Sequence, residues 1–194
     1  MIIGLTGATG SGKSLISKQL KDKGAFIIDC DKISHEIIKK GENAYKEIVN
    51  HFSHHILDED KNIIRRKLGD IVFSDKKELK FLNECTHKYI NEKVLSEIEY
   101  AKKGLYKLIV IDAPLLTEAG LDRKCDKIWV VYADTETRIQ RIIKRDGITY
   151  EQAKNRILSQ KNWVEYKAFA DVIIDNSKDL DYVKKQIEVL TKDD

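Results

Sequence analysis

The sequence is poor in the residues that build disulfide frameworks and metal sites. It has three cysteines, Cys30, Cys85 and Cys125, and none of them forms a CxxC pair. This number and spacing predict reduced thiols in a cytosolic protein rather than disulfides or a zinc site. The histidines lack metal-ligand spacing as well, and we expect the stretch "HFSHH" to be a solvated helix end. They are His35, His51, His54, His55 and His87.

Long apolar runs and a strong charge of one sign are also missing. No apolar run approaches the ~20 residues that a membrane-spanning helix needs, and the opening "MIIGLTG" lacks the charged segment of a signal peptide. The net charge is only +3, whereas a dedicated nucleic-acid binder is usually much more basic. We therefore expect a cytoplasmic protein without a membrane or nucleic-acid partner, whose basic residues cluster around a small anionic ligand.

Short runs rich in β-branched residues alternate with helical patterns along the chain. Near-continuous apolar character is typical of strands that are covered on both faces of a parallel sheet. The alternation predicts a doubly wound α/β fold with right-handed crossovers. Helices are expected at Lys13–Lys23 and Leu180–Leu190. The predicted strands are Ile2–Thr6, Ala25–Asp29, Lys107–Asp112, Lys127–Tyr132 and Val172–Asp175.

Two long excursions interrupt this alternation. The segment Asp31–Tyr106 is patterned as helices, and it is too long for a simple crossover. We expect it to form a helical subdomain beside the sheet. A second excursion, Asp134–Lys167, is helical and rich in charged residues. The predicted division is a core of residues 1–31, 105–134 and 168–194, an insertion at about 32–104 and a second excursion at about 135–167.

The stretch "GATGSGKS" matches the phosphate-binding pattern G-x-x-x-x-G-K-[ST], follows a predicted strand and opens a predicted helix. Glycines allow successive N–H groups to converge on phosphate oxygens, and the helix N-terminus adds its positive end. Lys13 would reach the β- and γ-phosphates, and the Ser14 hydroxyl would bind Mg²⁺. The predicted nucleotide-binding residues are Gly7, Ala8, Thr9, Gly10, Ser11, Gly12, Lys13, Ser14 and Leu15.

Such phosphate loops serve kinases, GTPases, motors and helicases, so the loop alone does not fix the reaction. Two signatures of guanine-nucleotide switches are missing, because no Asp is followed three residues later by Gly and "NSKD" is not N-K-x-D. A kinase for a small molecule needs an acceptor-binding subdomain and a charged segment that excludes water, and both are expected here. A nucleoside or nucleotide kinase is the first alternative, and a nucleotide-driven switch or assembly factor is a second.

Two strand ends carry carboxylates where ligands gather in a doubly wound sheet. Asp31, in "DCD", could accept a proton from an attacking hydroxyl or help to hold Mg²⁺. It could equally be the N-cap of a helix that starts at Lys32. Asp112 stands in the place of a Walker-B carboxylate that acts on Mg²⁺, or it could be a turn residue before Pro114, the only proline.

The second excursion contains a row of arginines. Arg138, Arg141 and Arg145 are spaced i, i+3 and i+7, which places them along one helical face, and Arg156 follows. Such a stripe is often only a solvated surface. Beside a phosphate loop, however, arginines can neutralise the charge that develops on a transferred phosphoryl group.

These motifs, in this order, closely resemble the dephospho-coenzyme A kinase family. The resemblance runs nearly end to end and rests on "GLTGATGSGKS", "IIDCDKI", "RRKLGDIVF", "DAPLLTEAG", "RIIKRDGITYEQAKNRILSQ" and "ADVIIDN". It implies phosphorylation of the ribose 3′-hydroxyl of dephospho-CoA by MgATP. It also implies a three-layer P-loop kinase fold with a five-stranded parallel sheet, a helical CoA-binding domain at about 32–104 and a lid at about 135–167.

The resemblance also implies roles for single residues. Asp31 becomes the preferred general base, with Asp29 structural. Arg65, His87 and Asp112 join Asp31 on the substrate-binding side.

On the nucleotide side, the resemblance keeps the roles of Lys13 and Ser14. Arg141 and Arg145 match the lid arginines of the family, and Arg141 is expected to act in catalysis together with Lys13.

The chain departs from the family pattern at two places. His87 is followed by Lys88 where the family has proline, and Tyr166 stands where the family often has lysine, with Lys167 next to it. Neither change touches the phosphate loop.

Overall fold

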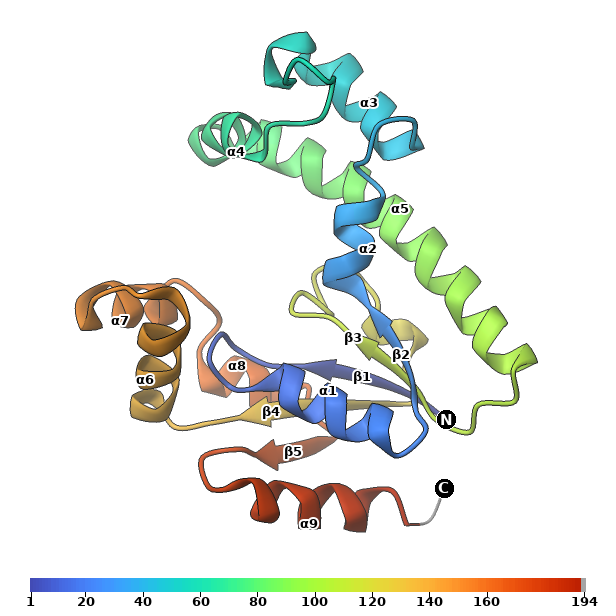
Figure 1. Cartoon of the computed structure of the whole chain (residues 1–194), viewed down its shortest axis with the longest axis vertical. Helices are drawn as coiled ribbons and strands as arrows, with labels where there is room; N and C mark the ends of the chain where they lie inside the picture. Colours follow the sequence, from blue (N-terminus) through green and yellow to red (C-terminus); the bar gives the residue numbers. More distant parts are fainter. Residues whose placement is uncertain (193–194) are drawn as a thin grey trace. The chain divides into compact units, whose positions relative to one another are not determined.

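The computed structural model describes residues 1–192 and contains one five-stranded parallel sheet in the order β2-β3-β1-β4-β5. The bounds predicted for β1, β4 and β5 are correct, whereas β2 and β3 begin one and two residues later than predicted. The central place of β1 brings the loop that follows it to the middle of the sheet's carboxyl edge (Figure 1). The strands are β1 (Ile2–Thr6), β2 (Phe26–Asp29), β3 (Ile109–Asp112), β4 (Lys127–Tyr132) and β5 (Val172–Asp175).

Helices connect the strands, as the alternation predicts, except between β3 and β4, where only a short 3₁₀ turn occurs. The helix that follows the phosphate loop ends one residue earlier than predicted, and the last helix has the predicted bounds. None of the helices in residues 1–192 is long and apolar enough to cross a membrane. They are α1 (Lys13–Asp22), α2 (Cys30–Glu36), α3 (Asn43–Phe52), α4 (Arg65–Ser74), α5 (Lys76–Lys103), α6 (Thr135–Asp146), α7 (Tyr150–Leu158), α8 (Trp163–Ala168) and α9 (Leu180–Leu190), with short 3₁₀ turns at His54–Ile56 and Asp122–Lys124.

The chain divides into two compact units. The first unit comprises Met1–Ile28 and Tyr100–Asp194, and the second comprises Asp29–Glu99. The first unit contains the phosphate loop and nearly the whole sheet, together with α1 and α6 to α9. The second unit is helical and contains α2, α3, α4 and most of α5.

The core of the first unit is built where α1 and α9 pack on the sheet. Ile16 and Leu20 of α1 are four residues apart, as are Val183 and Ile187 of α9, and all four side chains are buried. Spacing of i, i+4 puts each pair on one helical face. Both faces share one apolar cluster with β1, β4 and their neighbours, which fixes the start of α1 relative to the strands.

The segment between β4 and β5 has a small core of its own. Ile139 and Ile142 of α6 pack with Ala153 and Ile157 of α7. The Asp134 carboxylate caps α6 by accepting a hydrogen bond from the Thr137 N–H (2.9 Å). Side-chain and backbone bonds from Thr137 hold the pKa of Asp134 below its usual range. Capping boxes begin α7 and α8, so the order of this segment follows from local sequence.

In the second unit, α5 runs without a break through His87 and Lys88. The lysine at the family's proline position therefore continues the helix. Its ammonium lies 3.2 Å from a carboxylate oxygen of Glu47 on α3, and Tyr89 donates a hydrogen bond to the same carboxylate. The Tyr89 bond, together with Lys88, lowers the pKa of Glu47. This cluster ties α5 to α3.

The surroundings of the cysteines and histidines are those of residues with a structural role. No disulfide is present among the three cysteines, and burial raises the pKa of Cys85 to about 11 and that of Cys125 to about 12, so neither thiol is activated. The expectation of a solvated helix end is confirmed for His51, which is exposed in the last turn of α3. Its ring also stacks on Phe81 with centroids 3.7 Å apart and pairs with Glu78. Within residues 1–192 no group of three or more potential metal-binding side chains occurs.

The packing of α9 on the sheet can be tested with two substitutions on that helix. Ile187 is fully buried and Val189 is mostly exposed. Ile187→Ala should lower the free energy of unfolding by about 2–5 kcal/mol, since it deletes buried apolar groups and leaves a cavity. Val189→Ala should change it by less than about 0.5 kcal/mol. Urea denaturation measures both, and equal losses would contradict this placement of α9.

Candidate active site

The phosphate loop, residues 7–14, lies between β1 and α1, as the motif predicts. Gly10 and Gly12 have φ values of +78° and +88°, in the left-handed region that favours glycine. A Cβ atom would also lie 2.8 Å from the Arg138 carbonyl oxygen at Gly10 and 2.1 Å from the Asn176 side-chain nitrogen at Gly12. The glycines therefore permit both the bend of the loop and the close approach of its neighbours.

Side chains outside the loop hold its carbonyl groups. Arg138 Nε donates to the Thr9 carbonyl (2.9 Å), and Arg141 Nη1 donates to the carbonyls of Gly10 (3.4 Å) and Ser11 (3.2 Å). A trans peptide points its C=O and N–H in opposite directions. Holding these carbonyls on the outer side therefore turns the following N–H groups toward the inner side of the loop. Converging N–H groups of this kind form a concave anion-binding site.

Asn176 completes this outer shell. It follows β5 directly and is buried, and its side-chain amide donates to the Ser11 carbonyl (2.7 Å). The backbone carbonyl of Asn176 accepts a hydrogen bond from Arg141 Nη2 (2.8 Å). No role was predicted for Asn176 from the sequence, although its place at the end of a parallel strand is a signal that could have indicated one.

Lys13 and Asp112 form an ion pair in which both side chains are largely buried. Asp112 is the last residue of β3, and β3 lies next to β1, with Asp112 opposite Leu5 in the register. This neighbouring pair of strands brings the carboxylate to the lysine at the start of α1. The Asp112 side chain is thus directed to the phosphate loop, in agreement with the Walker-B interpretation of its position.

The three arginines of α6 have different partners. Arg138 and Arg141 contact the loop, whereas the Arg145 guanidinium pairs with the Asp146 carboxylate (2.7 and 2.9 Å). This pairing raises the pKa of Arg145. Arg156 binds the same carboxylate. The common helical face therefore does not give these residues a common site, and the structure does not bring Arg145 to the loop.

Lys161 is a second residue that the sequence analysis missed. Its ammonium lies 2.8 Å from the Thr117 hydroxyl and 2.9 Å from a Glu118 oxygen. Partial burial would raise the pKa of Glu118, but hydrogen bonds, the first from Lys161, hold it below its usual range. Tyr166, at the family's lysine position, is buried in the same region, where Lys161 and Arg138 are the basic residues of the lining.

In the second unit, α2 begins at Cys30, one residue after β2 ends. Asp29 is its N-cap, since a carboxylate oxygen accepts a hydrogen bond from the Lys32 N–H (2.9 Å). The alternative in which Asp31 caps a helix starting at Lys32 is therefore wrong. Asp31 lies in the first turn of α2 and is exposed.

Of the other residues predicted on the acceptor side, Arg65 and His87 also lie in this unit, whereas Asp112 belongs to the first unit. Arg65 is the first residue of α4, and one of its guanidinium nitrogens lies 2.7 Å from Nε2 of His35 on α2. Because arginine has no acceptor atom, the guanidinium donates and the imidazole accepts. His87 is half-buried in the middle of α5. The unit thus brings Arg65 to α2, the helix that also carries Asp31.

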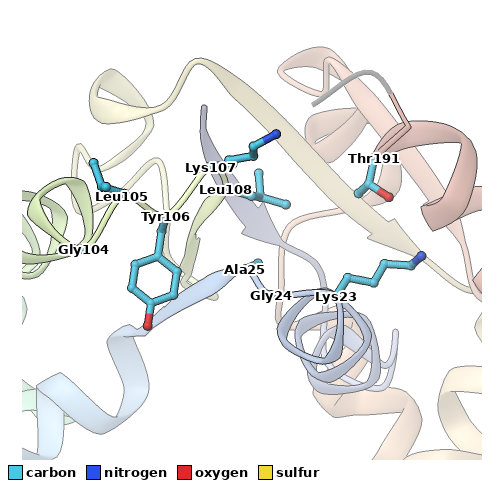
Figure 2. Close-up of a pocket in the computed structure, with 9 residues that line it drawn as sticks. All are labelled: Lys23, Gly24, Ala25, Gly104, Leu105, Tyr106, Lys107, Leu108 and Thr191. Carbon is cyan, nitrogen blue, oxygen red and sulfur yellow. The ribbon is translucent and has the colours of Figure 1, made fainter.

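A cavity of about 470 Å³ lies in the first unit, at the end of the sheet opposite the phosphate loop (Figure 2). Its lining includes Lys23 and Ala25, just before β2, and Lys107 and Leu108, just before β3. These residues precede the strands, whereas the phosphate loop follows one. The cavity is therefore separate from the candidate active site.

Comparison with known proteins identifies the family of the chain. The model of the dephospho-CoA kinase family (CoaE) matches residues 1–181. The curated dephospho-CoA kinase of Fusobacterium nucleatum is 45% identical over 189 residues, covering 97% of this chain and 95% of the relative. That of Aquifex aeolicus is 41% identical over 197 residues and covers 98% of each chain.

Solved structures give the same family and fold. The dephospho-CoA kinase of Campylobacter jejuni superimposes with a TM-score of 0.73 at 30% identity, over 98% of this chain and 96% of that one. A shikimate kinase from Acinetobacter baumannii, at 16% identity and a TM-score of 0.56 over 99% and 93% of the two chains, shares only the fold. By its sequence and its fold, this chain belongs to the dephospho-CoA kinase family.

Proposed function

We propose that this chain transfers the γ-phosphoryl group of ATP to the ribose 3′-hydroxyl of dephospho-CoA, giving CoA and ADP in the final step of CoA biosynthesis. The observation that carries the proposal is a phosphate loop with an adjoining Lys13–Asp112 pair, in a chain that matches the dephospho-CoA kinase family over residues 1–181. The fold supplies the donor side in the first unit. The second unit, with the insertion predicted at about 32–104, supplies the acceptor side.

On the donor side, the loop N–H groups and Lys13 bind the phosphates. To reach them, the Lys13 ammonium must loosen its contact with Asp112. Ser14, exposed in the first turn of α1, and Asp112 then offer a hydroxyl and a carboxylate, which are the oxygen donors that Mg²⁺ prefers. These two residues would hold the ion, which when bound neutralises charge on the β- and γ-phosphates.

On the acceptor side, Asp31 takes the proton of the attacking hydroxyl. Asp29 satisfies the first turn of α2, so the helix does not need the Asp31 carboxylate as its cap. His35 is four residues further on, on the same helical face, and Arg65 lies against it. An acceptor hydroxyl at Asp31 would thus have the Arg65 guanidinium on the same face of α2, beyond His35. A cation in that place suits the diphosphate of dephospho-CoA, and His87 would contribute from α5.

The arginines act on the nucleotide in two ways. Arg141 is fixed at the outer side of the loop through the Gly10, Ser11 and Asn176 carbonyls, where its charge favours the bound phosphates. Arg145 reaches them only if it leaves Asp146. We therefore expect the segment at about 135–167 to act as a lid whose closure exchanges this ion pair for contacts with ATP.

Acceptor choice is the direct test of the function. In a coupled assay of ADP release, dephospho-CoA should stimulate turnover strongly, whereas nucleosides and nucleoside monophosphates should not. The physical reason is that only the correct acceptor places a hydroxyl at Asp31 and a diphosphate at Arg65. ADP release without an acceptor at the same rate as with dephospho-CoA would rule out a kinase function. Stimulation by a nucleoside would favour a nucleoside kinase.

The base can be tested with a matched pair of carboxylates. Asp31→Asn should lower kcat by on the order of 10²-fold or more, as expected for a lost general base, with ADP binding retained. Asp29→Asn should stay close to wild type, because asparagine is an equally good N-cap. Steady-state kinetics and calorimetry measure both. An Asp31→Asn enzyme with wild-type kcat, or an equal loss in Asp29→Asn, would remove Asp31 from this role.

A further inference from the structure

The main chain of Thr9, in the middle of the phosphate loop, is held on both sides by one segment of the protein. The Thr9 carbonyl accepts a hydrogen bond from Arg138 Nε, and the Thr9 N–H donates to Gln160 Oε1, each at 2.9 Å. Arg138 is on α6, and Gln160 lies in the turn between α7 and α8. These bonds fix the two peptide groups that flank Thr9, and with them its φ and ψ angles.

The glycines near Thr9 explain why a fixed main-chain conformation at this residue matters. Gly7 and Gly10 lie on either side, and glycine has the most conformational freedom to lose on ordering. A glycine-rich loop without outside contacts would have to be ordered by its ligand, and that ordering would reduce the affinity. Two fixed peptide groups between the glycines remove much of this loss before ATP binds.

Arg138 is an unfavourable choice if only stability is considered. Its guanidinium is half-buried, and its Nη2 atom is buried without a hydrogen-bond partner in residues 1–192. Burial lowers the pKa of Arg138. A buried cation that meets only a carbonyl recovers little of its lost hydration. The same charge beside a loop that binds phosphates favours the anion.

We propose that Arg138 and Gln160 are positioning residues that hold the Thr9 main chain in the conformation that binds the ATP phosphates. The inference rests on the nucleotide role proposed above for the loop. Neither side chain needs to touch the nucleotide, since both act through the backbone of Thr9. The segment at about 135–167 thereby shapes the donor site, in addition to the lid role proposed above.

Gln160→Met is the sharpest test, because it removes the acceptor oxygen at nearly constant volume on an exposed residue. Gln152→Met is the matched control. Gln152 Oε1 also accepts a backbone N–H bond of 2.9 Å, from Thr149 in the same segment, but it does not touch the loop. Both variants lose one bond of the same kind, so their thermal stabilities should fall similarly or little.

Nucleotide affinity should separate the two variants. We expect Gln160→Met to weaken ADP binding by about three- to tenfold, as for one lost hydrogen bond, and to raise the KM for ATP without changing that for dephospho-CoA. Hydrogen exchange of a peptide containing residues 7–14 should become faster. Gln152→Met should match wild type in all three measurements. Arg138→Met should weaken ADP binding by about tenfold or more, because its bond is charge-assisted.

Three results would overturn the proposal. The first is ADP binding by Gln160→Met and Arg138→Met within twofold of wild type. The second is a loss of ADP affinity in Gln152→Met equal to that in Gln160→Met. The third is a parallel rise of the KM values for ATP and for dephospho-CoA in Gln160→Met. ADP binding needs no acceptor, so this outcome is independent of the reaction. A failure of the proposed function would instead appear in the wild-type enzyme, as an absence of stimulation by dephospho-CoA.

Discussion

Three carbonyl groups of the phosphate loop, at residues 9–11, are held from outside, and the rest of the donor site depends on this constraint. The donors are Arg138, Arg141 and Asn176. A loop rich in glycine has many conformations of similar energy, so its own residues do not select one. The selecting side chains come from α6 and from the residue after β5. The sheet order β1-β4-β5 brings these two places beside the loop.

The cations of the phosphate loop and of α6 differ in what neutralises them. Lys13 and Arg145 each pair with a carboxylate, whereas Arg138 and Arg141 bind backbone carbonyls. A carbonyl is a dipole without net charge, so these two arginines leave a positive potential at the loop. Such a potential favours a polyanion such as ATP. The paired cations become available only when their carboxylates find another partner, and for Asp112 that partner would be the metal ion proposed above.

The sequence was sufficient to predict the strands, the phosphate loop and the last helix, because each has a local signal in apolar runs, glycine spacing or helical period. It was insufficient for contacts between distant segments. Helical spacing put Arg141 and Arg145 on one face, but only the tertiary structure gives one the loop and the other Asp146. The cap of α2 was misjudged because one alternative began the helix at Lys32, whereas it starts at Cys30. The bond of Gln160 to the loop has no local signal at all.

The position of that cap bears on the chemistry of the acceptor side. A carboxylate that accepts a backbone hydrogen bond at a helix start is committed to that bond, and in α2 this carboxylate belongs to Asp29. Asp31 is two residues further on, and side chains with that spacing do not face each other on a helix. The helix therefore needs only Asp29 as its cap, which leaves the Asp31 carboxylate for the role proposed above. The Asp31 face instead continues to His35 and its partner Arg65, so the proposed acceptor site would have one carboxylate for a hydroxyl proton and one guanidinium for an anion.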